Sequence, residues 1–293
     1  LNPDGTLKEG VQGSFKVEGY EMHTGANGNP TFVPKSQNTT SGTWSALVGP
    51  NGGNGVNYKV WAIAVSGNDV YVGGDFTQAN VGGATVSANR VARFNTITNT
   101  WSALIGSDGG NGVNSWVYAI AVSGNDVYVG GEFTQANVGG ATVSANRVAR
   151  FNTTNNTWEP LGSGGGNGMN GAVNGIVISD SYVYVSGIFD AANVGGTTVS
   201  ARGVARFNTT TNTWESLGSG GGNGVDGLVY TIAVSGNYVY VGGNFTQSNI
   251  GGVQVSANRV ARFNTTTNTW EPLGSGSGNG VSGTVRAIAV SGD

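Results

Sequence analysis

The chain contains no cysteine and a single histidine, His23, among its 293 residues. This composition argues against a His/Cys zinc site, and a nucleophile–His–acid triad would have to use His23. We expect His23 to lie in an exposed turn instead. The absence of cysteine fits a secreted protein without disulfides and equally a cytosolic protein, so it does not assign a compartment.

Charge and long hydrophobic runs are also scarce. Charged residues make up 10% of the chain and the formal net charge is −3. Because nucleic-acid-binding proteins usually carry a basic stripe, we predict no nucleic-acid partner. No stretch reaches the roughly 18 apolar residues of a transmembrane helix, so we predict no membrane span. The first residue is leucine rather than methionine, which indicates either a removed signal peptide or tag, or a partial sequence.

Glycine is abundant, with 53 residues, and threonine, asparagine and serine are frequent. Glycine allows tight turns, and threonine and valine favour strands, so the composition predicts β-structure. No apolar run with a period of 3.6 is long enough to indicate a helix. A surface of low charge that is rich in glycine, threonine and asparagine is typical of bacterial extracellular proteins. We therefore expect an extracellular or cell-surface location.

A pattern of strand-like stretches and aromatic residues recurs with a period of 56 or 57 residues. Val70 to Phe76 is followed by Phe94 and Trp101, and this order returns three more times. Such a period indicates supersecondary units that stack on one another. Each unit is predicted to be a four-stranded antiparallel meander with a type I′ hairpin tip at Gly82–Gly83. In the first unit the strands are expected at 60–65, 69–76, 84–95 and 100–104. The tryptophans that mark the period are Trp44, Trp101, Trp158, Trp214 and Trp270.

The two ends of the chain are complementary. Residues 284–291 match only the first strand of a unit, whereas 1–44 match a degenerate unit without its first strand, with strands expected at 13–23 and 30–37. Joined, they predict an all-β fold, a five-bladed β-propeller of four-stranded antiparallel blades with one blade composite from both chain ends. This single domain spans 1–293, with degenerate N-terminal strands in 1–44, four repeats in 45–270 and a closing strand in 271–293.

The closing strand has two possible uses. It completes the ring of its own chain, or it is donated to the N-terminal blade of a neighbouring copy, which gives a head-to-tail filament. The sequence leaves both open. The apolar and small residues expected in this strand are Thr284, Val285, Ala287, Ile288, Ala289 and Val290.

The repeat resembles the kelch-type blade. The residues that carry the resemblance are the hydrophobic run that ends in Gly73–Gly74, and Phe94 seven positions before Trp101. It covers residues 45–270 and implies a propeller fold, but not one function, because kelch-like blades serve as adaptors, actin binders, oxidases and lectin-like modules. Ser186 and Ile188 depart from the pattern in the third unit, and the period differs from common kelch repeats. A bacterial surface relative of the family is therefore the better description.

Carboxylates form no repeated catalytic pattern. Asp75 and Glu132 are equivalent, but the other two units have Ile188 and Asn244 there. General acid–base catalysis needs carboxyl groups in a fixed geometry, so we expect no enzyme activity and no catalytic residues. An enzyme would have to depend on a single residue such as His23 or Asp190.

The glycine-rich loops do not predict a cofactor or metal site. Residues 162–168 lack the Gly-Lys-Ser/Thr sequence and the following helix of a phosphate-binding loop. A calcium site at Asp108 or Asp226 would have one carboxylate per loop, against the roughly 6–8 oxygens that calcium takes. Loop conformation is a sufficient reason for these glycines.

Arginines recur at two positions of the unit. We expect each guanidinium to tie adjacent blades through backbone carbonyls or to stack on an aromatic ring; the alternative is a ring of cations that binds anionic glycans. The positions are Arg93, Arg150, Arg206 and Arg262, with Arg90, Arg147 and Arg259 three residues earlier in three units.

One position varies between units, at the start of each innermost strand. Its residues are expected near one mouth of the central channel, where aromatic faces beside polar groups could hold a sugar, although packing between blades explains them too. The sequence thus favours a non-enzymatic structural or adhesive propeller, with a lectin-like glycan-binding module as the alternative. Its partners would be copies of itself or surface glycans. The residues of this candidate ligand ring are Trp61, Tyr118, Asn174, Tyr230 and Arg286.

Overall fold

The computed structural model describes residues 20–24, 30–34, 45–275 and 278–291. The chain divides into two compact units, Leu1–Ala46 and Leu47–Asp293, and each is described by itself. Whether one propeller spans 1–293 stays a prediction.

The first unit contains an antiparallel hairpin of β1 (Tyr20–Thr24) and β2 (Pro30–Pro34). β2 lies within the second range expected from the sequence, and β1 lies within the first except for its last residue, Thr24. His23 pairs with Thr31 inside β1, so the prediction that it lies in a turn is wrong. The fourth strand expected before Trp44, and Trp44 itself, lie outside the described residues.

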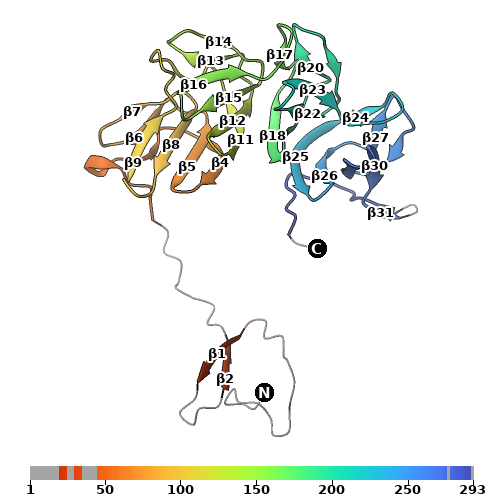
Figure 1. Cartoon of the computed structure of the whole chain (residues 1–293), viewed down its shortest axis with the longest axis horizontal. Helices are drawn as coiled ribbons and strands as arrows, with labels where there is room; N and C mark the ends of the chain where they lie inside the picture. The colour runs from red at the N-terminus through yellow and green to blue at the C-terminus, as the bar shows by residue number, and fades with distance from the viewer. Residues whose placement is uncertain (1–19, 25–29, 35–44, 276–277, 292–293) are drawn as a thin grey trace. The chain divides into compact units, whose positions relative to one another are not determined.

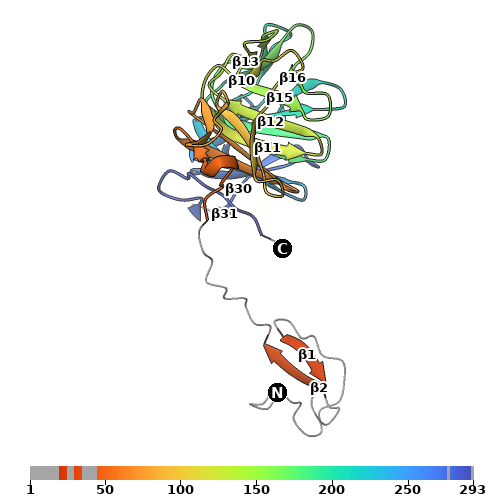
Figure 2. The same ribbon diagram turned by 90° about the vertical axis from the view of Figure 1, so that its left-hand side faces the viewer.

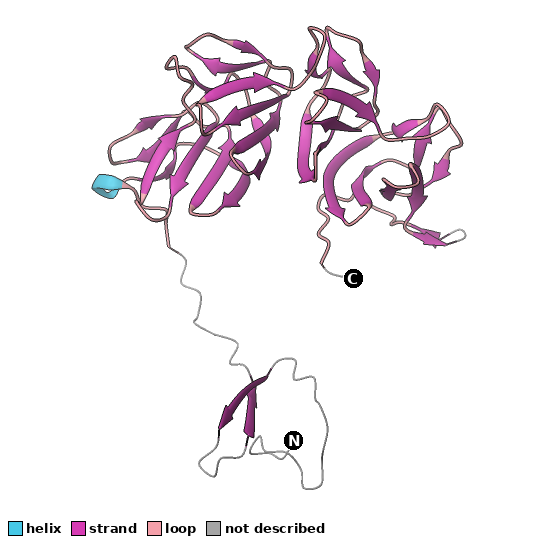
Figure 3. Cartoon of the chain, viewed as in Figure 1, coloured by secondary structure: helices cyan, strands magenta, loops and turns pink. Residues whose placement is uncertain are grey.

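The second unit repeats a four-stranded antiparallel sheet four times (Figures 1 and 3). In the first copy the order is β4 (Val60–Ser66), β5 (Asp69–Gly74), β8 (Val91–Asn95) and β9 (Thr100–Ala103). The predicted meander is therefore confirmed. The other three copies are β11 (Val117–Ser123), β12 (Asp126–Gly131), β15 (Val148–Asn152), β16 (Thr157–Pro160); β18 (Val173–Ser179), β19 (Tyr182–Gly187), β22 (Val204–Asn208), β23 (Thr213–Ser216); and β25 (Leu228–Ser235), β26 (Tyr238–Asn244), β29 (Val260–Asn264), β30 (Thr269–Pro272).

Each repeat also contains a three-stranded sheet that the sequence analysis missed. In the first repeat it consists of β3 (Asn54–Val56), β6 (Gln78–Val81) and β7 (Val86–Ser87). The expected third strand at 84–95 is therefore two strands, β7 and β8, in different sheets. In Figures 1 and 2 the copy of this sheet in the second repeat lies beside β15 and β16. The other copies are β10 (Asn111–Val113), β13 (Gln135–Val138), β14 (Val143–Ser144); β17 (Asn167–Met169), β20 (Ala191–Val194), β21 (Val199–Ser200); and β24 (Asn223–Val225), β27 (Gln247–Ile250), β28 (Val255–Ser256).

The Gly-Gly pair between β6 and β7 is a hairpin tip, but it is not the predicted type I′ turn. Gly82 has φ +85°, whereas Gly83 is outside the left-handed region. A Cβ on Gly83 would lie 2.6 Å from both the Gly53 nitrogen and the Pro50 oxygen. The second glycine is therefore required by the close approach of another loop rather than by φ. Pro50–Gly52 of that loop form a single 3-10 turn, η1.

Neighbouring four-stranded sheets pack through equivalent contacts at the first two repeats, whereas the third repeat has a buried serine, Ser186, in place of the glycine. Val117 and Ile120 of β11 point at Gly73 of β5, where only a glycine leaves room for them. Val173 and Ile176 meet Gly130 in the same way. Because apolar burial of this kind is the main stabilising term in such stacks, each blade depends on the next.

The periodic tryptophans connect successive repeats. Trp158 packs against Phe151 of the adjacent strand with ring centroids 5.1 Å apart. Its indole Nε1 donates a hydrogen bond of 3.2 Å to the carbonyl of Leu104, which follows the last strand of the preceding repeat. The same bond joins Trp101 to Leu47, Trp214 to Leu161 and Trp270 to Leu217.

Candidate functional sites

The first inner strand, β4, presents an uncovered apolar face. Ile63 and Val65 are 64% and 67% exposed, whereas the residues equivalent to Ile63, namely Ile120, Ile176 and Ile232, are 7–8% exposed. In the later repeats this face is buried against the preceding sheet. An exposed apolar face of this kind marks a surface that another element can cover.

Residues 284–291 occupy the place of an inner strand on the last sheet. The Val285 nitrogen donates to the Gly243 oxygen at 3.0 Å, and a Cβ on Gly242 would lie 2.5 Å from Val285 Cγ1 and 2.9 Å from Ile288 Cδ1. These are the contacts that Val117 and Ile120 make with Gly73. Residues 284–291 therefore pack against the last sheet as β11 packs against the first, but no strand is assigned to them. Before it lies a short hairpin of β31 (Gly274–Ser275) and β32 (Gly278–Asn279).

The ends of the second unit are not joined by strand pairing in the described part of the chain. No sheet is closed, so the composite blade and the number of five blades stay predictions.

The structure brings the candidate ligand positions together in pairs. Trp61 contacts Tyr118 with ring centroids 5.2 Å apart, and the Arg286 guanidinium lies 5.3 Å from the centre of the Tyr230 ring. Asn174 donates a hydrogen bond of 3.0 Å to the Val229 carbonyl. Each of these contacts is made with the adjacent repeat, as packing between blades requires. A role of the five positions in ligand binding stays a prediction.

Trp116 extends the Trp61–Tyr118 pair and was missed by the sequence analysis. Its ring centroid is 5.7 Å from that of Trp61 and 6.3 Å from that of Tyr118. Both tryptophans are about 40% exposed, at 41% for Trp61 and 40% for Trp116. The sequence did distinguish this residue, because a tryptophan stands at a position where the later repeats have the aliphatic residues Ala172 and Leu228. We call Trp61, Trp116 and Tyr118 the aromatic cluster.

Two carboxylates lie near the hydroxyl of Tyr118. Burial, together with the charge and hydrogen bond of Glu132 and the charge of Asp75, raises the pKa of Tyr118 to about 12. Tyr118 is therefore a neutral hydrogen-bond donor at neutral pH. Glu132 is exposed, and Asp75 is half-buried 3.6 Å from Arg90. The cluster thus combines exposed aromatic faces with acceptor oxygens.

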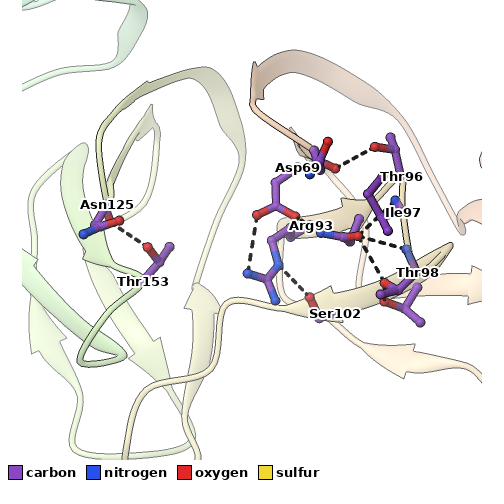
Figure 4. A network of polar contacts seen from close by, with 11 residues as sticks. Asp69, Arg93, Thr96, Ile97, Thr98, Ser102, Asn125 and Thr153 are labelled. Atoms are coloured by element: carbon purple, nitrogen blue, oxygen red, sulfur yellow. Dashed lines mark hydrogen bonds and ion pairs between the residues drawn. The ribbon is translucent and has the colours of Figure 1, made fainter.

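The arginines at the first repeated position form contacts within their own sheet. Arg93 donates to the Ser102 hydroxyl at 3.1 Å and lies 3.7 Å from Asp69 (Figure 4). Arg206 pairs with Glu215 at 2.7 Å and stacks on Tyr182 at 4.6 Å. The prediction of aromatic stacking is confirmed there and for Arg262 on Tyr238. The prediction that these arginines link adjacent blades is wrong, because the partners named above lie on neighbouring strands of the arginine's own sheet.

A position diagonally across the strand pair from these arginines explains a substitution noted in the sequence. Asp69 and Asp126 lie 3.7 and 3.6 Å from Arg93 and Arg150. Tyrosines replace these aspartates in the last two repeats, and there the guanidinium stacks on the ring. An ion pair is therefore exchanged for a cation–π contact, and both keep the same arginine in place.

Asparagines with positive φ organise the three-stranded sheets. Asn137 has φ +59° and donates through Nδ2 to the Ala141 carbonyl at 3.0 Å and to Asp108 Oδ1 at 2.8 Å. These bonds explain the asparagine that precedes Val-Gly-Gly or Ile-Gly-Gly in every repeat, a role that sequence reasoning missed. The members of this set are Asn80, Asn137, Asn193 and Asn249.

The two carboxylates considered for calcium have protein partners. Hydrogen bonds from the Asn137 side chain and the Ala141 and Gly110 amides lower the pKa of Asp108. Burial raises the pKa of Asp226, but hydrogen bonds from the Thr246 hydroxyl and the Gln247 and Thr246 amides outweigh it, and the net shift is downward. Among the described residues, no group of three or more His, Cys, Asp or Glu side chains is placed to hold a metal ion. Within the same residues, no helix has the length and hydrophobicity to cross a bilayer.

Residues 125–155 match the model of a family described as "Domain of unknown function (DUF5122) beta-propeller". With the repeated antiparallel sheets, this match supports a β-propeller fold. The kelch-like assignment stays a prediction.

A curated relative is the "Polarized growth protein rax2" of Schizosaccharomyces pombe. It is 30% identical over 116 residues, which make up 36% of this chain and 10% of the relative. The chain therefore spans a small part of rax2.

Solved structures that are similar to this chain include two computationally designed proteins and a WD40 propeller. Ika4 is 15% identical with a TM-score of 0.44, covering 73% of this chain and 97% of Ika4. Ika8 is 15% identical with a TM-score of 0.44, covering 95% of this chain and 76% of Ika8. The WD40 β-propeller domain of Doa1 is 10% identical with a TM-score of 0.41, covering 74% of this chain and 69% of that chain.

Proposed function

We propose that this chain is a non-enzymatic, secreted or cell-surface β-propeller with a structural or adhesive role, and that it assembles into filaments. The observation that carries the proposal is the apolar face of β4, with Ile63 and Val65 mostly exposed where the equivalent isoleucines are buried. The name of the relative rax2 refers to polarized growth, which supports a role at the cell surface.

Assembly would use residues 284–291 as a donated strand. This segment packs against the last sheet as the inner strand of a following repeat would, and its backbone would pair with a strand of a neighbouring copy. The N-terminal blade expected from residues 1–44 lacks an inner strand, so the neighbour's segment would complete it. A blade completed in this way would supply the cover that β4 lacks. Head-to-tail contacts of this kind do not close, and they produce filaments.

The test is the size of the purified chain by light scattering, followed by electron microscopy. We expect filaments for the full chain, and after deletion of residues 284–293 a monomer slightly lighter than the 29.6 kDa of the full chain. Replacing Ile63 and Val65 together with lysine should also stop assembly, because two charges would be buried in the new contact.

The matched control is Ile97→Lys. Ile97 is 71% exposed and lies in the turn between β8 and β9, so this variant should assemble normally. A full chain that remains a compact monomer at all concentrations would contradict assembly, and would favour closure of the ring by its own strand.

The aromatic cluster supports a second candidate function, a lectin-like glycan-binding module. Trp61 and Trp116 expose ring faces on which a sugar could stack, and Glu132 and the Tyr118 hydroxyl could bond its hydroxyl groups. The cluster occurs at one pair of repeats, so it would form a single site rather than a ring of equivalent sites.

Glycan-array screening tests this second function. We expect Trp61→Ala and Trp116→Ala each to weaken binding by about tenfold or more, because each removes one stacking face. Tyr58→Ala is the control, since Tyr58 is 58% exposed and belongs to the same repeat but not to the cluster. A negative array, or equal losses for Tyr58→Ala, would count against the lectin-like function.

A further inference from the structure

The second repeated arginine position has a defined structure in three repeats. Arg90, Arg147 and Arg259 have φ of +65°, +66° and +66°. Each backbone amide donates to a phenylalanine carbonyl, and Nη1 of the same side chain donates to that oxygen at 3.1, 3.3 and 2.8 Å. The guanidinium thus bonds the carbonyl oxygens of Phe76, Phe133 and Phe245. In the first repeat Asp75 also lies 3.6 Å from this arginine.

The third repeat has the same backbone without the arginine. Gly203 has φ +69°, and its amide donates to the Phe189 carbonyl at 2.9 Å, as the arginine amides do. There is no side chain at this position to provide the second donor. The acidic residue beside the arginine is also replaced, by Ile188. In the other repeats an arginine guanidinium occupies the space beside this phenylalanine carbonyl, and we call this space the guanidinium slot. The third repeat has the slot, but its own residue at this position provides no guanidinium to fill it.

A shallow cavity of about 340 Å³, widely open to solvent, lies at this place. Phe189 and Gly203 line it from the third repeat, and Val225 and Leu228 line it from the fourth. Its volume is in the range of small-ligand pockets, about 300–1,000 Å³.

The charges of this cavity differ from those at the other repeats. Asp190 stands where the other repeats have Thr77, Thr134 and Thr246, and Asp226 stands where they have Asn57, Asn114 and Asn170. Both carboxylates line the cavity. The lowered pKa of Asp226 keeps it ionised at neutral pH. Arg202, exposed at the rim, supplies one positive charge, so the lining carries a net charge of −1 from two carboxylates and one guanidinium.

We propose that this cavity binds a guanidinium group supplied from outside the chain, either an arginine side chain of a partner protein or a small guanidino compound. The three other repeats show that the slot fits a guanidinium that donates to the phenylalanine carbonyl. Asp190 and Asp226 add the negative charge that a cation requires when it leaves water. A planar guanidinium can donate to a carbonyl and a carboxylate at the same time, whereas an ammonium group is a point charge.

The test is isothermal titration calorimetry of the full chain with four probes. These are arginine amide, agmatine, lysine amide and the tripeptide acetyl-glycyl-arginyl-glycine amide. We expect saturable binding of the three guanidino probes and at least about tenfold weaker binding of lysine amide. Tighter binding of the tripeptide than of agmatine would identify a partner's arginine as the ligand, and equal or tighter binding of agmatine would identify a small guanidino compound.

Two variants test whether binding occurs in this cavity. Gly203→Arg introduces the arginine that the other three repeats have at this position. Those arginines already adopt the left-handed φ that Gly203 has, so the backbone accepts the change. The new side chain should abolish binding because it occupies the guanidinium position itself. A Cβ at Gly203 would lie 2.9 Å from Val229 Cγ2, so this methyl group has to shift. Asp226→Asn requires no such shift of a neighbouring side chain. Asn57 and Asn114 occupy the equivalent position in other repeats, and each accepts the same two backbone hydrogen bonds as Asp226. It should weaken binding by about tenfold through loss of charge.

Three results would overturn the proposal. They are no saturable binding of any guanidino probe, equal binding of lysine amide, and unchanged binding in both Gly203→Arg and Asp226→Asn. The same titration in the variant that lacks residues 284–293 separates these results from assembly.

Discussion

Replacing Trp158 with alanine is expected to lower the free energy of unfolding by about 3–5 kcal/mol. The side chain is 5% exposed, so its removal leaves a large cavity beside Phe151. The substitution also removes the indole hydrogen bond to the Leu104 carbonyl, which joins one repeat to the preceding one. Urea unfolding followed by circular dichroism would measure the effect as a lower midpoint at constant slope.

Two further variants separate the causes. Trp158→Phe keeps an aromatic ring but leaves the Leu104 carbonyl without its donor, so its effect should be intermediate. Trp116→Ala removes a tryptophan that is 40% exposed and should cost less than about 1 kcal/mol. Equal losses for Trp158→Ala and Trp116→Ala would mean that the periodic tryptophans do not stabilise the contact between repeats.

Replacing Gly168 with alanine is expected to destabilise the protein by about 3 kcal/mol, because two penalties add. Gly168 has φ +51°, which strains any residue with a Cβ. A Cβ there would also overlap with the backbone carbonyl of Asn146 in the preceding repeat. Backbone atoms cannot turn away as a side chain can, so the two repeats would have to separate. Thermal unfolding would measure the loss.

Gly55→Ala is a matched control in the same chain. Gly55 is the equivalent glycine of the first repeat and has φ +57°, but no other atom lies within 4 Å of a Cβ placed there. Its substitution should cost only the backbone strain of about 1–2 kcal/mol. If Gly55→Ala and Gly168→Ala destabilise the protein equally, close approach between repeats is not what requires glycine at Gly168.

Much of the repeat could be read from the sequence because local patterns determine it. The valine- and tyrosine-rich run around Val72 predicted a strand, and the turn residues after Val65 predicted its start. These signals act over a few residues, so they need no knowledge of the remaining chain. The match of residues 284–291 to the first strand of a unit was found for the same reason, since Val285 and Ile288 repeat the order of Val117 and Ile120.

The three-stranded sheets could not be predicted in this way. β3 has three residues and β7 has two, which is too short for a periodic pattern. They exist because Asn80 and its equivalents bond loops about 30 residues apart in sequence, as Asn80 Nδ2 does with the Pro50 carbonyl at 3.3 Å. The glycine-rich loop, for which the sequence predicted no strand, therefore leads into one of the three strands of a small sheet.

The sequence by itself determined the repeat, its strands and the aromatic residues that mark it, because these depend on side-chain periodicity. Only the tertiary structure decided which copies of a repeated residue differ in environment. Ile63 is exposed and Ile120 is buried, although each occupies the same position of its repeat, because Ile120 packs against the sheet of the preceding repeat within the second unit. In the sequence, Gly203 is seen only as a glycine at a position where the other three repeats have an arginine. Its place beside Asp226 of the next repeat is a consequence of packing, and only that packing makes it the wall of a cavity.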